Sequence, residues 1–390
     1  METVSEICKK GLLWAKDQEY SGYSKGDALL SPLLRKVCGK NRYLQAAFYF
    51  IVSRSPVDLR SLIRVKKHLN IKALALFART YFNLYKITSD DQWLKEGLPL
   101  LDSILKFSRT DDYSGHCWGE AYSFQHVKFC IEAYSPRIVV TVEVAQGFID
   151  AYEITDDKKY LDIANSVAEF IANDLNAIEK NEKEICYSYI PKNNWKNINA
   201  NAKIASFLAR LSAKTNDQEI RQNARANMQW VVNRQTDYGA WYYTDPPGDS
   251  HIAHDNYHTG FILSSLFEYM NITGDQNWIE AYRRGLDFYE QNLFLPDGAP
   301  KWRSNRTYPL DIHGAAQGII NFALASAYVP EKLIVAQNIA DWTLKNMYNP
   351  QGRFYHQKGL LWTKKITLMR WCQAWMCYAL SVLLRNQKDE

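Results

Sequence analysis

The stretch ITDDKKYL at 154–161 has two near-copies in the chain, ITSDDQWL at 87–94 and ITGDQNWI at 272–279. Each copy is a short polar turn that leads into an amphipathic helical run with one polar face, such as Asp156–Asn173. A turn repeated at long intervals indicates supersecondary units that bury a shared core. These copies therefore predict a repeat protein built from helical hairpins.

Six loops with a Gly/aromatic signature complete the repeat. They are Tyr20–Gly26, Tyr113–Gly119, Ile185–Pro191, Tyr238–Pro246, Asp297–Ser304 and Gln351–Gly359. Most are followed by a second helical run that is richer in small and aliphatic residues, as at Gly314–Ala327. These second runs begin near Lys72, Ile138, Asn199, Tyr257, Gly314 and Met369, at intervals of 55 to 66 residues. Their composition is typical of helices buried on two sides.

The two ends of the chain each hold half of a hairpin. The run at 4–16 lacks a preceding helix, and the run at 369–384 lacks a following one. Pairing them gives six inner and six outer helices, which predicts an all-α fold, an (α/α)6 toroid with short β-like loops at one rim. We expect a single domain over 1–390 with an irregular helical insertion at 27–70, including helices at Leu44–Val52 and Val57–Leu69. An open solenoid is the alternative.

Bulk composition excludes several classes of partner. The 390 residues are 47% hydrophobic with a net charge of +5 and no Lys/Arg-rich run, which argues against nucleic-acid binding. Seven scattered cysteines without a CxxC pair indicate reduced thiols and a cytoplasmic setting. We see no signal peptide and no apolar run long enough to cross a membrane. Without a P-loop or dinucleotide fingerprint, we expect no cofactor.

The densest chemistry lies in YGAWYYTDPPGDSHIAHDNYHTGFILSSLF at 238–267. Its helical spacing begins near Tyr257, so His254, Asp255 and His258 fall at a helix N-terminus, where anions are favoured. Tyr257 or a histidine can transfer a proton, although Asp255 is equally suited to be a helix N-cap. The H-x2-H-x3-H spacing from His251 also allows zinc, but without an adjacent HExxH glutamate we expect no metal.

Neighbouring loops supply further candidates. Asp311 and His313 head the next inner run, with Asp311 as a possible cap. Arg303 and Arg306 could clamp an acidic substrate or form surface salt bridges.

Glu120 follows His116 and Trp118, and a carboxylate beside an indole can have a raised pKa and act as a general acid. Arg370 and Glu143 are charges on apolar inner runs, which need either a substrate or a buried partner.

Five tryptophans fall in or beside the loops, one for each of five repeats. They are Trp118, Trp195, Trp241, Trp302 and Trp362. Together with Tyr243, they predict an aromatic funnel on which sugar rings could stack, unless they simply cover the core.

Several motifs resemble known families. SGHCWGEAYSFQ, HDNYHTGFILSSLFEY, YPLDIHGAAQ and MRWCQAWMCYAL resemble (α/α)6-toroid proteins of bacterial and archaeal polysaccharide-biosynthesis clusters. DNYHTGFILSSL at 255–266 is similar to the DYHTTHINQL-type motif of D-glucuronyl C5-epimerases, which implies that Tyr257 is an acid/base. HDNYHTGF is more loosely similar to the HD-x-GF element of unsaturated glucuronyl hydrolases, which implies a catalytic Asp255.

These features lead to one principal hypothesis and two alternatives. The first is an epimerase or lyase that abstracts the C5 proton of a uronate in an acidic poly- or oligosaccharide, with Tyr257 as acid/base and His258 or His254 as its partner. The second is a glycoside hydrolase that uses two carboxylates among Asp255, Asp311, Glu120 and Glu143. The third is a non-catalytic glycan-binding protein of a polysaccharide assembly system.

Overall fold

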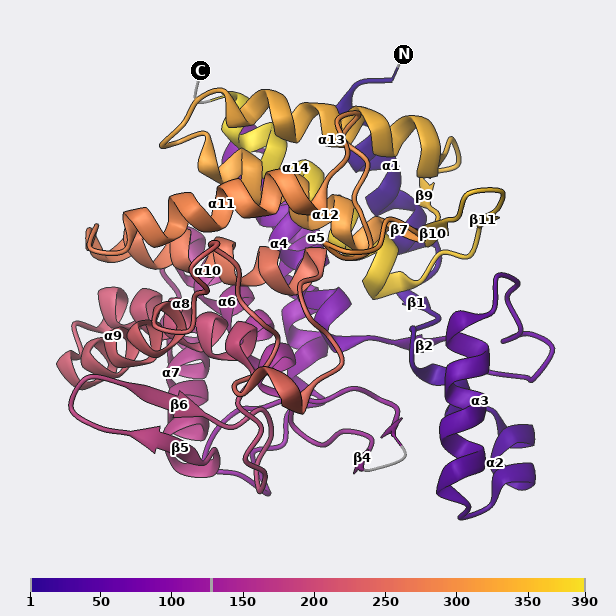
Figure 1. Cartoon of the computed structure of the whole chain (residues 1–390), viewed down its shortest axis with the longest axis horizontal. Coiled ribbons are helices and arrows are strands. Elements are labelled where there is room, and N and C mark those ends of the chain that lie inside the picture. Colours follow the sequence, from indigo (N-terminus) through magenta and orange to yellow (C-terminus); the bar gives the residue numbers. More distant parts are fainter. Residues whose placement is uncertain (1, 127–128, 389–390) are drawn as a thin grey trace.

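The computed structural model describes residues 2–126 and 129–388, and its core is a closed ring of six inner helices (Figure 1). The inner helices are α4 (Ile71–Thr88), α6 (Ile138–Thr155), α8 (Ile198–Thr215), α10 (Asn256–Thr273), α12 (Ile312–Ala325) and α14 (Trp375–Lys388), the last preceded by a π-helical turn at Met369–Ala374. Each packs against the next in this order, and α14 packs against α4, which closes the ring. The predicted (α/α)6 toroid is confirmed.

Six outer helices surround this ring. They are α1 (Val4–Asp17), α5 (Gln92–Leu105), α7 (Lys158–Asp174), α9 (Gln218–Val232), α11 (Ile279–Leu293) and α13 (Lys332–Met347). Helix α1 packs on α14 from the other end of the chain, where Gln373 Nε2 donates to the carbonyl of Gly11 at 2.9 Å and Cys8 Sγ contacts the carbonyl of Cys377 at 3.5 Å. None of the helices within the described residues is long and apolar enough to span a bilayer.

The repeated ITDD-like sequence is the tight turn from an inner to an outer helix. In three copies the inner helix ends on a left-handed residue, Ser89, Asp156 or Gly274. A threonine hydroxyl just before that residue accepts the backbone N–H two positions further on, as Thr155 does from Asp157 at 3.3 Å. The N–H of the left-handed residue in turn donates to a free carbonyl of the helix end, as Asp156 does to Tyr152 at 2.8 Å.

The longer connections run from outer to inner helices and gather at the opposite end of the ring. Their short antiparallel pairs are β1 (Ser21–Gly22) with β2 (His68–Leu69), β3 (Phe124–Gln125) with β4 (Cys130–Ile131), β5 (Ala177–Lys180) with β6 (Ile185–Tyr187), and β8 (Tyr348–Asn349) with β9 (Arg353–Phe354). A three-stranded sheet has the order β11 (Thr363–Lys364), β10 (Gln357–Lys358), β7 (Leu310–Asp311). This arrangement places all the inner-helix N-termini beneath the long loops.

The insertion at 27–70 contains a 3-10 turn (Asp27–Leu30), α2 (Pro32–Cys38) and α3 (Arg42–Arg54). Figure 1 shows α2 and α3 beside the ring, on the side opposite α9. The prediction of a helix at Val57–Leu69 is wrong. That segment is a series of turns ending in β2, in which Arg64 has a φ of 58° and the buried Arg60 pairs with Asp27 at 2.7 Å.

Candidate active site

A cavity of about 710 Å³ lies at the loop end of the toroid. The second residue of every inner helix, counting the π-helical turn as the start of the sixth, lines it. These residues are Lys72, Val139, Asn199, Tyr257, His313 and Arg370. Equivalent positions on six radially arranged helices must point to the same place, so the repeat itself assembles this ring of side chains. The ring forms the wall of the cavity at its narrow end.

Asp255 and His258 form a hydrogen-bonded pair at the start of α10. The Asp255 carboxylate caps the helix by accepting the backbone N–H of His258 at 2.8 Å, and its second oxygen accepts from His258 Nδ1 at 2.7 Å. Because an ionised carboxylate can only accept, the proton of a neutral imidazole lies on Nδ1 and the lone pair on Nε2. His258 lines the cavity, whereas Asp255 is 4% exposed behind it. The helix-cap role expected for Asp255 is present, and the same carboxylate also holds the His258 ring.

Tyr257 and His313 stack face to face at the cavity wall. Their ring centroids are 5.1 Å apart with an interplanar angle of 10°, and His313 stacks in turn on Trp375 at 5.0 Å. Both ring nitrogens of buried His313 lack a protein partner. Burial, followed by the nearby Lys72 and Arg370 cations, holds the pKa of His313 well below its ordinary value. His313 is therefore a neutral imidazole that can exchange hydrogen bonds with a ligand.

The Tyr257 ring also lies 4.4 Å from the His258 ring. Burial and the Asp255 carboxylate raise the pKa of Tyr257 well above its ordinary value, so its hydroxyl remains protonated and can donate. Tyr243 packs against the other side of His258, also at 4.4 Å, and lines the cavity as expected.

The cavity lining is rich in cations. Arg370 donates to Glu120 at 2.7 Å, and the Nε groups of Arg370 and Arg137 are buried without a protein partner. Lys25 lies 3.9 Å above the Trp371 ring. All these residues line the cavity. The excess of positive charge favours a ligand that carries an anionic group.

Glu120 does not have the raised pKa that its place beside an indole suggested. Burial opposes its ionisation, but Arg370 and Arg137 outweigh burial and lower its pKa. Asn70 Nδ2 also donates to its second oxygen at 2.5 Å. An ionised carboxylate with both oxygens hydrogen-bonded can position Arg370 but is a poor general acid.

Lys72 is one of the charged cavity residues that were not predicted from the sequence. It is 4% exposed, and its Nζ donates to the carbonyl of Val139 at 3.2 Å and lies 3.8 Å from Glu143. Burial lowers the pKa of Lys72 to about 7, with Glu143 offsetting only part of that effect. A lysine that is half protonated near neutral pH and faces a cavity can respond to a bound anion.

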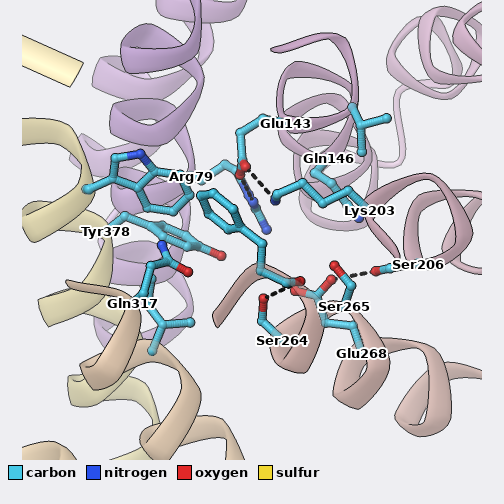
Figure 2. Close-up of a pocket in the computed structure, with 14 residues that line it drawn as sticks. Arg79, Glu143, Gln146, Lys203, Ser206, Ser264, Ser265, Glu268, Gln317 and Tyr378 are labelled. Carbon is cyan, nitrogen blue, oxygen red and sulfur yellow. Dashed lines mark hydrogen bonds and ion pairs between the residues drawn. The ribbon is translucent and has the colours of Figure 1, made fainter. Parts of the chain in front are cut away.

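A second cluster of charges surrounds a small pocket that shares Phe261 and Trp375 with the cavity (Figure 2). Glu143 bonds to Arg79 at 2.6 Å and Lys203 at 2.9 Å around a pocket of about 30 Å³. Although burial opposes ionisation, Lys203, Lys72 and Arg79 together lower the pKa of Glu143 to about 2. Glu143 is therefore an ionised carboxylate paired with buried cations. This is the buried partner that the sequence analysis gave as the alternative to a substrate.

Two other expected catalytic residues have their polar atoms occupied by the protein. Asp311 caps α12 and accepts from Trp371 Nε1 and Gln357 Nε2, each at 2.8 Å, so it orients Trp371. His254 Nδ1 contacts the carbonyl of Trp241 at 2.9 Å and its Nε2 contacts the Tyr238 hydroxyl at 3.0 Å. Neither residue lines the cavity.

The proposed funnel of five loop tryptophans is wrong. Trp118 and Trp241 are at most 1% exposed, and their indole N–H groups donate to the carbonyls of Ile104 and Val231 in the core. The side chains of Trp302 and Trp362 are absent from the cavity lining, which includes Trp195. Loop indoles folded back onto the core because the Gly/aromatic loops pack closely over the outer helices.

Three further expected ligand contacts also lie off the cavity lining. His116 stacks on Trp118 and bonds to Ser108. Arg303 reaches the carbonyl of His251 at 3.3 Å, and Arg306 donates to the carbonyl of Tyr308 in its own loop. The cations that face the cavity instead come from the inner helices and from Lys25, Arg137 and Lys196. Within 2–126 and 129–388, no three His, Cys, Asp or Glu side chains converge to hold a metal.

Two of the missed residues, Lys72 and Trp375, are related to the repeat. Lys72 occupies the same helix position as Tyr257, His313 and Arg370, and aligning the inner runs at that position would have selected it. Trp375 lies in the helical turn that follows Arg370. The π-helical turn inserts one extra residue there, so the residue that faces the cavity is the fifth after Arg370 and not the fourth.

Comparisons with known proteins agree on the architecture. The family model for glycosyl hydrolase family 76 matches residues 141–313, less than half of the chain. The cellobiose 2-epimerase of Bacillus thermoamylovorans has a TM-score of 0.63 at 11% identity, covering 82% of this chain and 90% of its own. The family 76 α-mannanase of Bacteroides thetaiotaomicron scores 0.60 at 15% identity, covering 84% and 88%.

An unsaturated glucuronyl hydrolase specific for heparin scores 0.58 at 14% identity and covers 82% of this chain and 86% of its own. No curated protein matches the chain in sequence. At such identities the structural likeness establishes the fold: the chain is an (α/α)6 toroid, similar in architecture to enzymes that include sugar epimerases and glycoside hydrolases.

Proposed function

We propose that this protein is a carbohydrate-active enzyme that abstracts the proton at C5 of a uronate, or the equivalent proton of another acidic sugar, in a poly- or oligosaccharide. The observation that carries the proposal is the Asp255–His258 pair, whose Nδ1 bond at 2.7 Å leaves the lone pair on Nε2 of a histidine that lines the cavity. A carboxylate that fixes the tautomer and stabilises the imidazolium is the usual way to make a histidine an effective base.

His258 and the cations of the cavity would act on different parts of the substrate. His258 takes the proton from the carbon beside the carboxylate, and negative charge develops on the carboxylate oxygens as an enediolate. The free Nε–H of Arg370 and the Lys72 ammonium are the donors placed to stabilise that charge. Relative to the expectation from sequence, the base moves from Tyr257 to His258, and the clamp moves from Arg303 and Arg306 to Arg370 and Lys72.

The fate of the intermediate separates epimerase from lyase. Return of a proton to the opposite face of C5 gives the C5 epimer, whereas loss of the C4 substituent gives an unsaturated product. In either case His313 and Tyr243 would bind sugar hydroxyl groups. The free cysteines, six of the seven buried, support the cytoplasmic setting that we also propose.

The test is deuterium exchange at C5. The protein is incubated in D2O with a panel of uronate polymers, and exchange is followed by NMR and mass spectrometry. We expect exchange in wild type and a loss of about 10²- to 10⁴-fold in His258→Gln, the range for removing a general base. His116→Gln is the matched control, because it makes the same change away from the cavity. Absence of exchange in wild type across the panel would refute the proposal.

A glycoside hydrolase remains the second candidate, favoured by the family 76 match over residues 141–313. The only carboxylates in the described cavity lining are Glu120, which is paired with Arg370, and Asp249 on an exposed loop. A two-carboxylate mechanism needs one acid with a raised pKa. Release of new reducing ends without C5 exchange would favour hydrolysis, and glycan binding with neither reaction would favour the non-catalytic binding protein.

A further inference from the structure

The insertion at 27–70 differs in charge from the rest of the protein. It contains nine lysines and arginines but two aspartates, a net charge of +7, whereas the whole chain carries +5. Arg60 is buried against Asp27, and the other eight basic residues are exposed. Among the described residues, none of those eight forms a salt bridge with an acidic side chain. The insertion therefore presents an uncompensated positive surface.

Exposed apolar side chains lie among these charges. Helix α3 buries one face, at Ala46, Tyr49 and Val52, but its opposite face exposes 41% of Leu44 and 54% of Ile51. Residues spaced by seven positions share a helix face. Helix α2 adds Leu33 and Val37, and the following turns add Val57 and Leu62. The α3 helix thus has two apolar faces, and only one of them is covered.

A second element, distant in sequence, supplies further exposed apolar residues on the same side. The β10–β11 hairpin carries Leu360, Leu361 and Trp362 at its turn, exposed by 72%, 92% and 41%. Its stem is tied to α3, because Lys364 Nζ donates to the carbonyl of Ser53 at 3.0 Å. Figure 1 shows this hairpin on the same side of the toroid as α2 and α3. In the part of the chain that the structure describes, ten of the fifteen large exposed hydrophobic residues belong to the insertion and this hairpin, so they are clustered on the surface.

We propose that this face, formed by α2, α3, the turns to residue 66 and the β10–β11 hairpin, docks on an anionic lipid membrane. Leucine and tryptophan at a hairpin tip suit insertion at the headgroup boundary, where indoles are favoured. An amphipathic helix with basic residues beside its apolar face suits adsorption in the plane of the interface. The unpaired lysines and arginines would be attracted to anionic headgroups, which are concentrated in cytoplasmic leaflets. Docking would bring the cavity close to the membrane, because Tyr49 on the inner face of α3 lines it.

Vesicle co-sedimentation tests the proposal without any reference to catalysis. Wild type should sediment with phosphatidylcholine vesicles that contain about one third phosphatidylglycerol and much less with pure phosphatidylcholine, and added salt should weaken the binding. Leu361→Glu should weaken binding by about tenfold or more, because it places an anion where the apolar tip inserts. Leu361 is so exposed that this change leaves the fold intact, which circular dichroism would verify.

Ile334→Glu on the outer helix α13 is the matched control, since Ile334 is 64% exposed but lies outside the docking face. It should bind as wild type, and so should His258→Gln, which separates docking from the proposed chemistry. Equal sedimentation of Leu361→Glu and wild type would overturn the proposal. So would a concentration-dependent dimer that Leu361→Glu abolishes while wild type ignores anionic vesicles, since the face would then bind a second copy of the chain.

Discussion

Replacing Lys72 by methionine should remove part of the pH dependence of stability. The Lys72 side chain is buried, and its pKa falls from an ordinary 10.5 to about 7. Between these values the unfolded chain holds a proton that the native protein has released. The free energy of unfolding therefore rises with pH over that window, because the unfolded state binds more protons.

The size of the effect follows from proton linkage. At pH 7 native Lys72 is about half protonated, and by pH 9 it is almost fully neutral, while an unfolded lysine remains charged. The difference in bound protons over this interval corresponds to about 2 kcal/mol of added stability, at about 1.4 kcal/mol for each full unit.

Urea denaturation at pH 7, 8 and 9 measures this contribution as the difference between wild type and Lys72→Met. The contribution of Lys364, whose pKa burial lowers to about 8, is present in both proteins and cancels. Exposed Lys95 on α5 provides the control variant Lys95→Met, which should keep the wild-type slope. If Lys72→Met also keeps that slope, Lys72 remains charged in the folded protein and the reasoning fails.

Three further changes probe the site and the core. Asp255→Asn should lower C5 exchange by about 100-fold while leaving the circular dichroism unchanged, because asparagine still caps the helix but cannot fix the His258 base; unchanged exchange would contradict the pairing. Glu143→Gln should lower the free energy of unfolding, measured by urea denaturation, by about 3–5 kcal/mol, because three cations lose their buried counter-charge. An unchanged free energy of unfolding would show that the three cations repel one another only weakly. Trp118→Phe should lower the free energy of unfolding by about 1–3 kcal/mol, because the indole hydrogen bond is lost, and should leave glycan affinity unchanged. Weakened affinity would show that Trp118 contacts the ligand after all.

The ring of helices was predictable because its signals are local. Period-3.6 patterns, the repeated turn and the missing partners of the two terminal runs depend on short stretches of sequence. Tyr257, His258, His313 and Arg370 were found for the same reason: each lies at or near the start of an apolar helical run, where the direction of the side chain is set by helix geometry.

The loop residues could not be placed in the same way. An indole in a loop can point to a cavity or fold back onto the core, and Trp118 and Trp241 do the latter. Arg303 and Arg306 likewise bond to carbonyl groups of nearby loops. The pKa of Glu120 depends on Arg370, which lies 250 residues further along the chain. These outcomes depend on long-range packing, which a residue pattern does not contain.

The ring of equivalent helix positions has a consequence for how such a protein can diversify. Five of the six positions carry a polar or titratable group, and the sixth holds Val139. Each position belongs to a different repeat, and the closure of the ring depends on other residues. A substitution at one position can therefore change the chemistry of the cavity while the other five side chains stay in place. Val139 is the one apolar residue among the six, so a polar side chain could be introduced there without removing an existing polar group.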